Sequence, residues 1–178
     1  MTEYKYHDKN EKIYPTIKFL CLVGELNELP YGKFSKILVA VDGSQASMDA
    51  AEYAIEIAKK DNAQLIALTV SNISFSASIG FPKPPNELRE VKEKNELETK
   101  EWFNRINKSA EQNKVHLKTE LIEREMSIEA EIVEYAEHEG VDLIIIGTKG
   151  KSGFKKLVLG SVASGVVKYA TCSVLVIR

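Results

Sequence analysis

The sequence predicts an α/β fold with one doubly wound, five-stranded parallel sheet and helices on both faces. Apolar runs of strand length alternate with segments of helical periodicity, which gives the order β-α-β-α-β-α-β-α-β. Most of the apolar runs are continuous, as in strands that helices cover on both faces. A chain of 178 residues with 44% hydrophobic residues has the size and the apolar content for one such domain.

The first half of the domain begins with a strand from Lys36 to Val41 and a helix after it. Ser44 or Ser47 is the candidate N-cap of this helix, because a side-chain oxygen there can accept a hydrogen bond from the first turn. Lysines within residues 59–62 mark its end, where positive charge suits the helix dipole. The second predicted strand is Leu65 to Val70.

A long loop and a long helix connect the second and third strands. The loop, residues 71–86, contains three prolines, and loops of this length are often functional. The helix, Glu87 to Asn113, is highly charged, which indicates a solvated face. Val115 to Ile122 alternates apolar and polar residues and is the third predicted strand.

Two further helices and two further strands complete the domain. Ser127 caps the next helix and Gly140 ends it. Leu143 to Ile146 is the fourth strand, the last helix begins at Gly160-Ser161, and Ser173 to Ile177 is the fifth strand.

We expect the strand order 3-2-1-4-5. This order places strands one and four side by side, with their connections leaving in opposite directions. Ligands of such sheets bind in the crevice at the carboxyl ends of these two strands.

Residues 1–33 precede the predicted domain, which spans residues 34–178. The first dozen residues are polar and charged, and Pro30-Tyr31-Gly32 is a turn signal. Ile17 to Val23 is a short strand or a packing segment, and the sequence leaves open whether it contacts the sheet or a partner subunit.

The connection between strand four and the last helix is rich in glycine, with Gly147, Gly150 and Gly153. Glycines let a ligand approach the backbone closely, and Gly160, Ser161 and Val162 at the helix start present N–H groups to an anion. Ile145 stands where a P-loop has its first glycine, and the spacing also excludes G-x-G-x-x-G. The plainer interpretation is a flexible loop with turn glycines.

From about Lys36 to Arg178 the sequence resembles a single universal stress protein domain of the ATP-binding branch. The resemblance rests on residues 37–44 (ILVAVDGS), on Gly147-x-x-Gly150 followed after nine residues by Gly160-Ser161, and on residues 173–177 (SVLVI). It implies an adenine nucleotide alpha hydrolase-like fold that binds ATP, or AMP or ADP, with Mg²⁺, and a homodimer through the last strand.

The sequence departs from the family pattern at two positions. Ser173 follows Cys172 where the family commonly has proline before the last strand, and Ala163 stands where a hydroxyl residue is frequent. The first departure concerns the dimer edge, and the second concerns one phosphate contact.

The candidate nucleotide site combines the loops after strands one and four. Asp42 can accept hydrogen bonds from ribose hydroxyls or help hold a cation, and its plainer role is to cap the first helix. Val41 and Val70 can contact adenine or belong to the strand core. Lys149 and three lysines within residues 151–156 suit a polyphosphate, with solvated surface as the alternative. The candidate residues are Val41, Asp42, Gly43, Ser44, Val70, Gly147, Thr148, Lys149, Gly150, Gly160, Ser161, Val162 and Ala163.

Composition argues against several classes of protein. The 24 basic and 26 acidic residues give no surplus of positive charge for nucleic acid. No apolar run is long enough to span a membrane and no signal peptide is recognised, so we expect a cytoplasmic protein. Two cysteines fit a reducing compartment, and Cys172, beside a buried strand, is expected to be structural.

We predict no catalytic or metal-binding residues and at most slow ATP hydrolysis, because the three histidines are scattered and belong to no motif. The favoured function is a nucleotide-dependent regulator of the stress-response type with an unknown protein partner. An ATP-using enzyme of the same fold class and a nucleotide-free interaction module are the alternatives. We expect a homodimer because the apolar edge strand Val174 to Ile177 needs cover.

Overall fold

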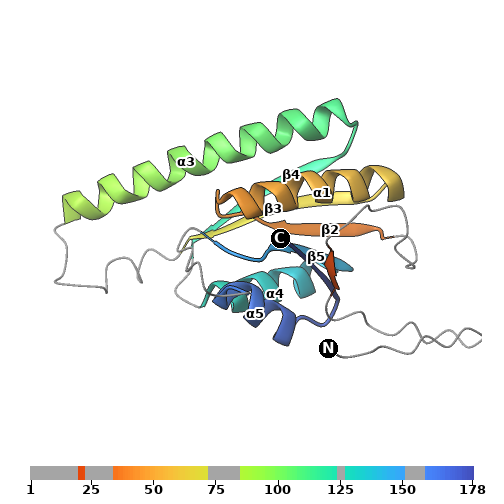
Figure 1. Ribbon diagram of the computed structural model, residues 1–178. Coiled ribbons are helices and arrows are strands. Elements are labelled where there is room, and N and C mark those ends of the chain that lie inside the picture. Colours follow the sequence, from red (N-terminus) through yellow and green to blue (C-terminus); the bar gives the residue numbers. More distant parts are fainter. Residues whose placement is uncertain (1–19, 23–33, 72–84, 124–126, 151–158) are drawn as a thin grey trace, which may run out of the picture.

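The computed structural model describes residues 20–22, 34–71, 85–123, 127–150 and 159–178. A parallel sheet lies between α1 and α3 on one face and α4 and α5 on the other (Figure 1). The strands are β1 (Leu20–Leu22), β2 (Lys36–Ala40), β3 (Gln64–Ser71), β4 (Leu117–Glu123), β5 (Leu143–Gly147) and β6 (Ser173–Ile177). The helices are α1 (Gln45–Asp61), α3 (Pro85–Gln112), α4 (Ile128–Glu139) and α5 (Ser161–Tyr169).

The sheet has the strand order β1-β6-β5-β2-β3-β4, and every neighbouring pair is parallel. The five strands that the sequence predicts are β2 to β6, so the predicted order 3-2-1-4-5 is confirmed. β2 pairs with β3 on one side and with β5 on the other. The two connections that leave these strands in opposite directions therefore diverge between β2 and β5.

The core lies in two layers, one on each face of the sheet. Ile37 and Val39 pack into the layer under α1 and α3, and Leu38 and Ala40 pack into the layer over α4 and α5. Successive strand residues point to opposite faces, so both sets are buried. This arrangement explains why the apolar runs in the sequence are continuous.

The residues at which the helices begin and end are largely those that the sequence predicts. Ser44 is the N-cap of α1, and its side chain accepts a hydrogen bond from the Ser47 N–H. Gly140 ends α4 in the left-handed conformation with φ 65°. Ser127 stands at the N-cap of α4, but its side chain makes no cap hydrogen bond.

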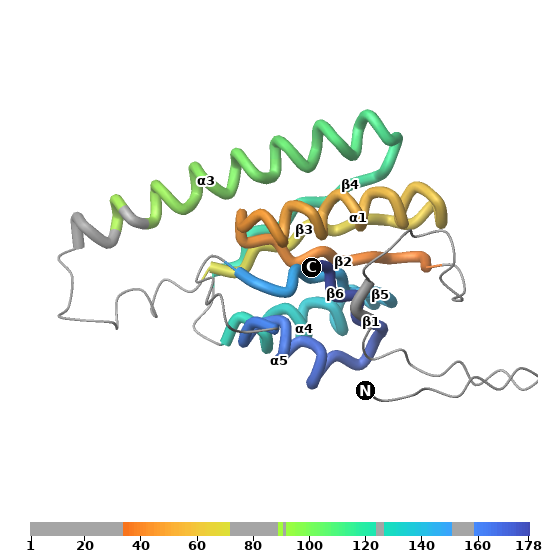
Figure 2. The backbone as a smooth tube through the Cα atoms, in the orientation of Figure 1, coloured from red at the N-terminus to blue at the C-terminus, as the bar shows by residue number. Residues whose placement is uncertain are grey.

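The sheet contains one strand more than the sequence predicts. β1 pairs in parallel with β6, with Leu20 opposite Leu175 and Leu22 opposite Ile177. On its other side β6 pairs with β5 (Figure 2). The described part of the segment Ile17 to Val23 is therefore a sheet strand. The edge of β6, which we expected to need a partner, is paired within the chain.

Much of what precedes the domain lies outside the described residues, as do residues 72–84 of the long loop. Within the described ranges, no helix is both long enough and apolar enough to cross a membrane.

Candidate functional site

The loops that follow β2 and β5 are in direct contact at the carboxyl edge of the sheet. The Ser44 hydroxyl lies 3.2 Å from the carbonyl oxygen of Lys149, which is 105 positions away in the sequence. A Cβ atom placed on Gly150 would lie 2.5 Å from Asp42 Oδ2. The strand order therefore brings together the loops after β2 and β5, which the sequence predicts to form the nucleotide site.

Asp42 shapes the turn that leads into α1. Its Oδ1 atom accepts hydrogen bonds from the Ser44 N–H at 3.0 Å and from the Ser44 hydroxyl at 2.6 Å. Gly43 between them has φ +77°, a conformation that favours glycine. Asp42 thus supports the helix start through Ser44, which is the cap, while its second oxygen faces Gly150.

Thr148 brings the two ends of the glycine-rich loop together. Its N–H donates to the Ile177 carbonyl, and its own carbonyl accepts from the Gly160 N–H, both at 2.7 Å. Lys149 is thereby held near the start of α5. The Gly160 N–H, which we expected to face an anion, is used within the protein.

The N-terminus of α5 has features of an anion site. Gly160 is the N-cap without a side-chain cap hydrogen bond, and the first-turn N–H groups have no acceptor within the helix. Ser161 is exposed, Val162 is half-buried and Ala163 is buried. A Cβ atom on Gly160 would lie 3.8 Å from the Cα of half-buried Lys149, so the backbone of this lysine runs beside the helix start.

Gly147 allows α1 to pack closely against the end of β5. A Cβ atom on Gly147 would lie 2.7 Å from the carbonyl carbon of Ala46 and 2.8 Å from its oxygen. The first turn of α1 therefore rests directly on the end of β5. The predicted role of Gly147 toward a ligand stays a prediction.

The two predicted adenine contacts differ in their surroundings. The Val41 N–H donates to the Leu68 carbonyl, the Val41 carbonyl accepts from the Thr69 hydroxyl, and Val41 is 4% exposed. Val41 therefore fits the plainer role of strand core. Val70, near the end of β3, is half-buried and more open to contact.

The structure describes only part of the glycine-rich loop between β5 and α5. Gly153 and three predicted lysines, Lys151, Lys155 and Lys156, lie outside the described residues. Across the ranges that the structure covers, no group of three or more His, Cys, Asp and Glu side chains could hold a metal ion.

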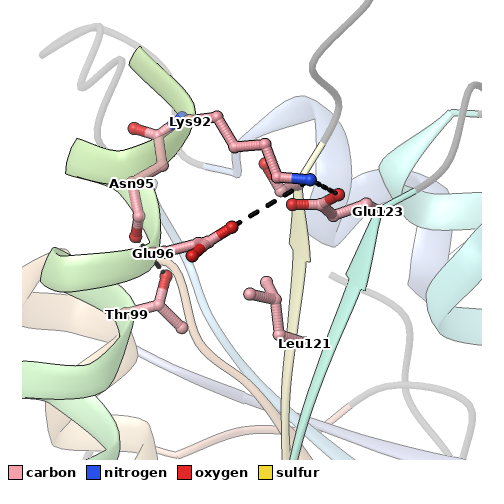
Figure 3. Close-up of a pocket in the computed structure, with 7 residues that line it drawn as sticks. Lys92, Asn95, Glu96, Thr99, Leu121 and Glu123 are labelled. Carbon is pink, nitrogen blue, oxygen red and sulfur yellow. Dashed lines mark hydrogen bonds and ion pairs between the residues drawn. The ribbon is translucent and has the colours of Figure 1, made fainter. Parts of the chain in front are cut away.

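A separate shallow pocket lies between α3 and the ends of β3 and β4 (Figure 3). Lys92 Nζ is 2.7 Å from Glu123 Oε2 and 4.0 Å from Glu96 Oε1. The hydrogen bond to Glu123 and the charge of its carboxylate raise the pKa of Lys92. The enclosed volume is ≈ 10 Å³, the space of about one water, so the pocket cannot hold a nucleotide.

Cys172 is expected to react slowly, because burial raises the pKa of its thiol to about 11. The thiolate fraction falls tenfold for each unit of pKa, so alkylation at pH 8 should be about 100-fold slower in the native than in the unfolded state. Iodoacetamide labelling of a Cys21→Ser variant, with and without urea, isolates Cys172. Equal rates in the two states would contradict the prediction.

The universal stress protein family model matches residues 33–178. The chain belongs to the universal stress protein family. The universal stress protein MJ0531 of Methanocaldococcus jannaschii is 40% identical over 147 residues, which cover 82% of each chain. Among solved structures, the universal stress protein UspA from Lactobacillus plantarum has a TM-score of 0.74 and 30% identity, covering 83% of this chain and 100% of its own.

Some universal stress proteins of known structure are described with adenine nucleotides. The protein from Archaeoglobus fulgidus in complex with dAMP has a TM-score of 0.59 and 20% identity, covering 81% of this chain and 98% of its own. Others are described with AMP, from Arabidopsis thaliana, and with cAMP, at 16% and 21% identity. At these identities the likeness to the present chain concerns the fold.

Proposed function

We propose that this universal stress protein binds ATP and acts as a nucleotide-dependent regulator with no or weak hydrolysis. The contact between the Asp42–Ser44 turn and the Lys149–Gly150 segment, beside the start of α5, carries the proposal. It lies at the switch point of the sheet, where ligands of this architecture bind. The family members described with dAMP, AMP and cAMP support an adenine nucleotide as the ligand.

The residues around this contact fit the parts of a nucleotide. The first-turn N–H groups of α5, the Ser161 hydroxyl and the Lys149 ammonium group suit phosphate oxygens. The Asp42 carboxylate stands at the meeting point of the loops, where it can accept from ribose hydroxyls. Val70 offers an apolar surface for the base.

Mg²⁺ fits this site only as a partner of the phosphates. Asp42 is the one carboxylate that the predicted site contains, and Mg²⁺ commonly uses one or two carboxylates, several waters and phosphate oxygens. When bound, Mg²⁺ would neutralise phosphate charge. Binding of ATP should therefore be stronger with Mg²⁺ than with EDTA.

The first test is to purify the protein natively, denature it and identify any released nucleotide by mass spectrometry. We expect adenine nucleotide in near-stoichiometric amount, with ATP predominant. ADP or AMP alone would point to hydrolysis or to another sensed ligand. An empty protein that also fails to bind ATP and Mg²⁺ in a titration would overturn the proposal.

We also propose that the protein forms a homodimer through the edge of β6, with the strand of a second copy in place of β1. Among the described residues, β1 pairs with β6 at three positions, and a strand of a second copy would have to replace these pairs. The Thr148 N–H takes the Ile177 carbonyl, so Val176 faces β1, and the parallel register directs the Leu22 N–H at the Val176 carbonyl. Leu22→Pro removes this N–H group and should strengthen dimerisation. Sedimentation equilibrium should detect a tighter dimer for this variant than for the native chain. Monomers in both cases at micromolar concentration would contradict the proposal.

A further inference from the structure

Trp102 of α3 packs against the turn that begins the candidate site. A Cβ atom built on Gly43 would lie 2.1 Å from Trp102 Cε2, 2.3 Å from Cζ2 and 2.6 Å from Nε1. These three ring atoms are the nearest neighbours of that position. The indole therefore fills the space beside Gly43 in which any other residue would place its side chain.

The turn beside this indole orients two groups of the site. Asp42 and Ser44 flank Gly43 and are joined to each other by two hydrogen bonds. Asp42 Oδ2 faces Gly150, and the Ser44 hydroxyl faces the Lys149 carbonyl. A displacement of Gly43 would therefore move the carboxylate and the helix cap together.

The core holds Trp102 in its place. The residue is half-buried and packs against the core layer that α1, α3 and the sheet share. Ile106, one turn later on α3, is 0% exposed and belongs to the same layer. A ring fixed in this way gives the turn a firm support, as a well-positioned site requires.

We propose that Trp102 is a positioning residue of the nucleotide site, which fixes the Asp42–Ser44 turn and couples α3 to the occupancy of the site. The inference rests on the proposed nucleotide binding. The residue packs against the turn at Gly43, so it acts through Asp42 and Ser44. No local pattern in the long, charged helix marks Trp102 for this role.

Calorimetric titration of ATP with Mg²⁺ tests the positioning role in three variants. Trp102→Ala should weaken binding about tenfold, because small displacements of site groups are costly. Trp102→Phe keeps a ring beside Gly43 and should retain most of the affinity. Phe103→Ala is the matched control, since Phe103 also packs against this core layer but is not among the atoms nearest to Gly43. It should bind ATP as the native chain does.

Intrinsic fluorescence tests the coupling directly, because the chain contains a single tryptophan. ATP should shift the emission of the native protein, with a midpoint that equals the calorimetric dissociation constant. Unchanged emission during measured binding would overturn the coupling.

The two proposals fail in distinguishable ways. If Trp102→Ala binds ATP with native affinity, or if Phe103→Ala loses as much ATP affinity as Trp102→Ala, the positioning role is overturned. Neither result contradicts the proposed nucleotide site. Failure of the native protein itself to bind ATP would overturn both proposals.

Discussion

Replacement of Gly160 by aspartate is expected to weaken ATP binding by at least about 100-fold. Gly160 is the N-cap of α5, beside the N–H groups that should meet the phosphates. A negative charge about 4 Å from a phosphate charge costs about 4 kcal/mol at an effective dielectric constant of 20, which exceeds the energy of a 100-fold change. Calorimetry with ATP and Mg²⁺ measures the effect.

Gly160→Asn is the matched control, because asparagine has the same size as aspartate and is an equally good N-cap. A Cβ atom at this position would lie 3.2 Å from the Thr148 carbonyl oxygen, so both variants require the same small adjustment. We expect Gly160→Asn to retain most of the affinity. Equal affinities of the Asp and Asn variants would show that α5 does not face an anion.

Gly147→Ala is expected to lower the unfolding free energy by about 2–3 kcal/mol, as overpacking of a core does. The new methyl group would meet the carbonyl carbon and oxygen of Ala46, and a backbone cannot rotate aside as a side chain can. α1 and β5 must therefore move apart. The melting temperature should fall by about 5–10 °C for a domain of this size, measured by calorimetry or circular dichroism.

Gly150→Ala places the same change in the same loop and serves as the control. Its methyl group would meet Asp42 Oδ2, the end of a side chain rather than backbone, and a shift of that carboxylate strains its hydrogen bonds to Ser44. Gly150 is exposed, so we expect the unfolding free energy of Gly150→Ala to fall by no more than about 1 kcal/mol, the worth of one hydrogen bond. Equal losses of stability in the two variants would contradict the role assigned to Gly147.

The parts of the fold that could be predicted are those with a local signal. Buried strands are continuous apolar runs, and Ser44 and Gly140 mark helix ends through their own chemistry. The strand order followed from the rules for parallel connections. The meeting of Asp42 with Gly150 followed in turn from that order, because adjacent parallel strands end at one edge.

What could not be predicted depends on contacts between distant segments. The sequence does not show that Ala46 lies against Gly147, that Thr148 takes up the Gly160 N–H, or that Trp102 covers Gly43. A loop glycine looks the same whether a ligand or a helix approaches it. The sequence does not decide whether Ile17 to Val23 is a strand or a packing segment for a similar reason. Such a short apolar run shows no clear periodicity and does not indicate which segment it packs against.

The pairing of β1 with β6 joins two strands that are far apart in the sequence, and this separation has a consequence for the order of folding. Leu20 lies opposite Leu175, so during synthesis β1 cannot pair with β6 until β6 has been synthesised. Once Lys36 is held in β2, only about a dozen residues separate β1 from the formed sheet, and closing such a loop costs roughly 2 kcal/mol beyond a constant. β1 should be the last strand to join the sheet and the first to leave it in local opening.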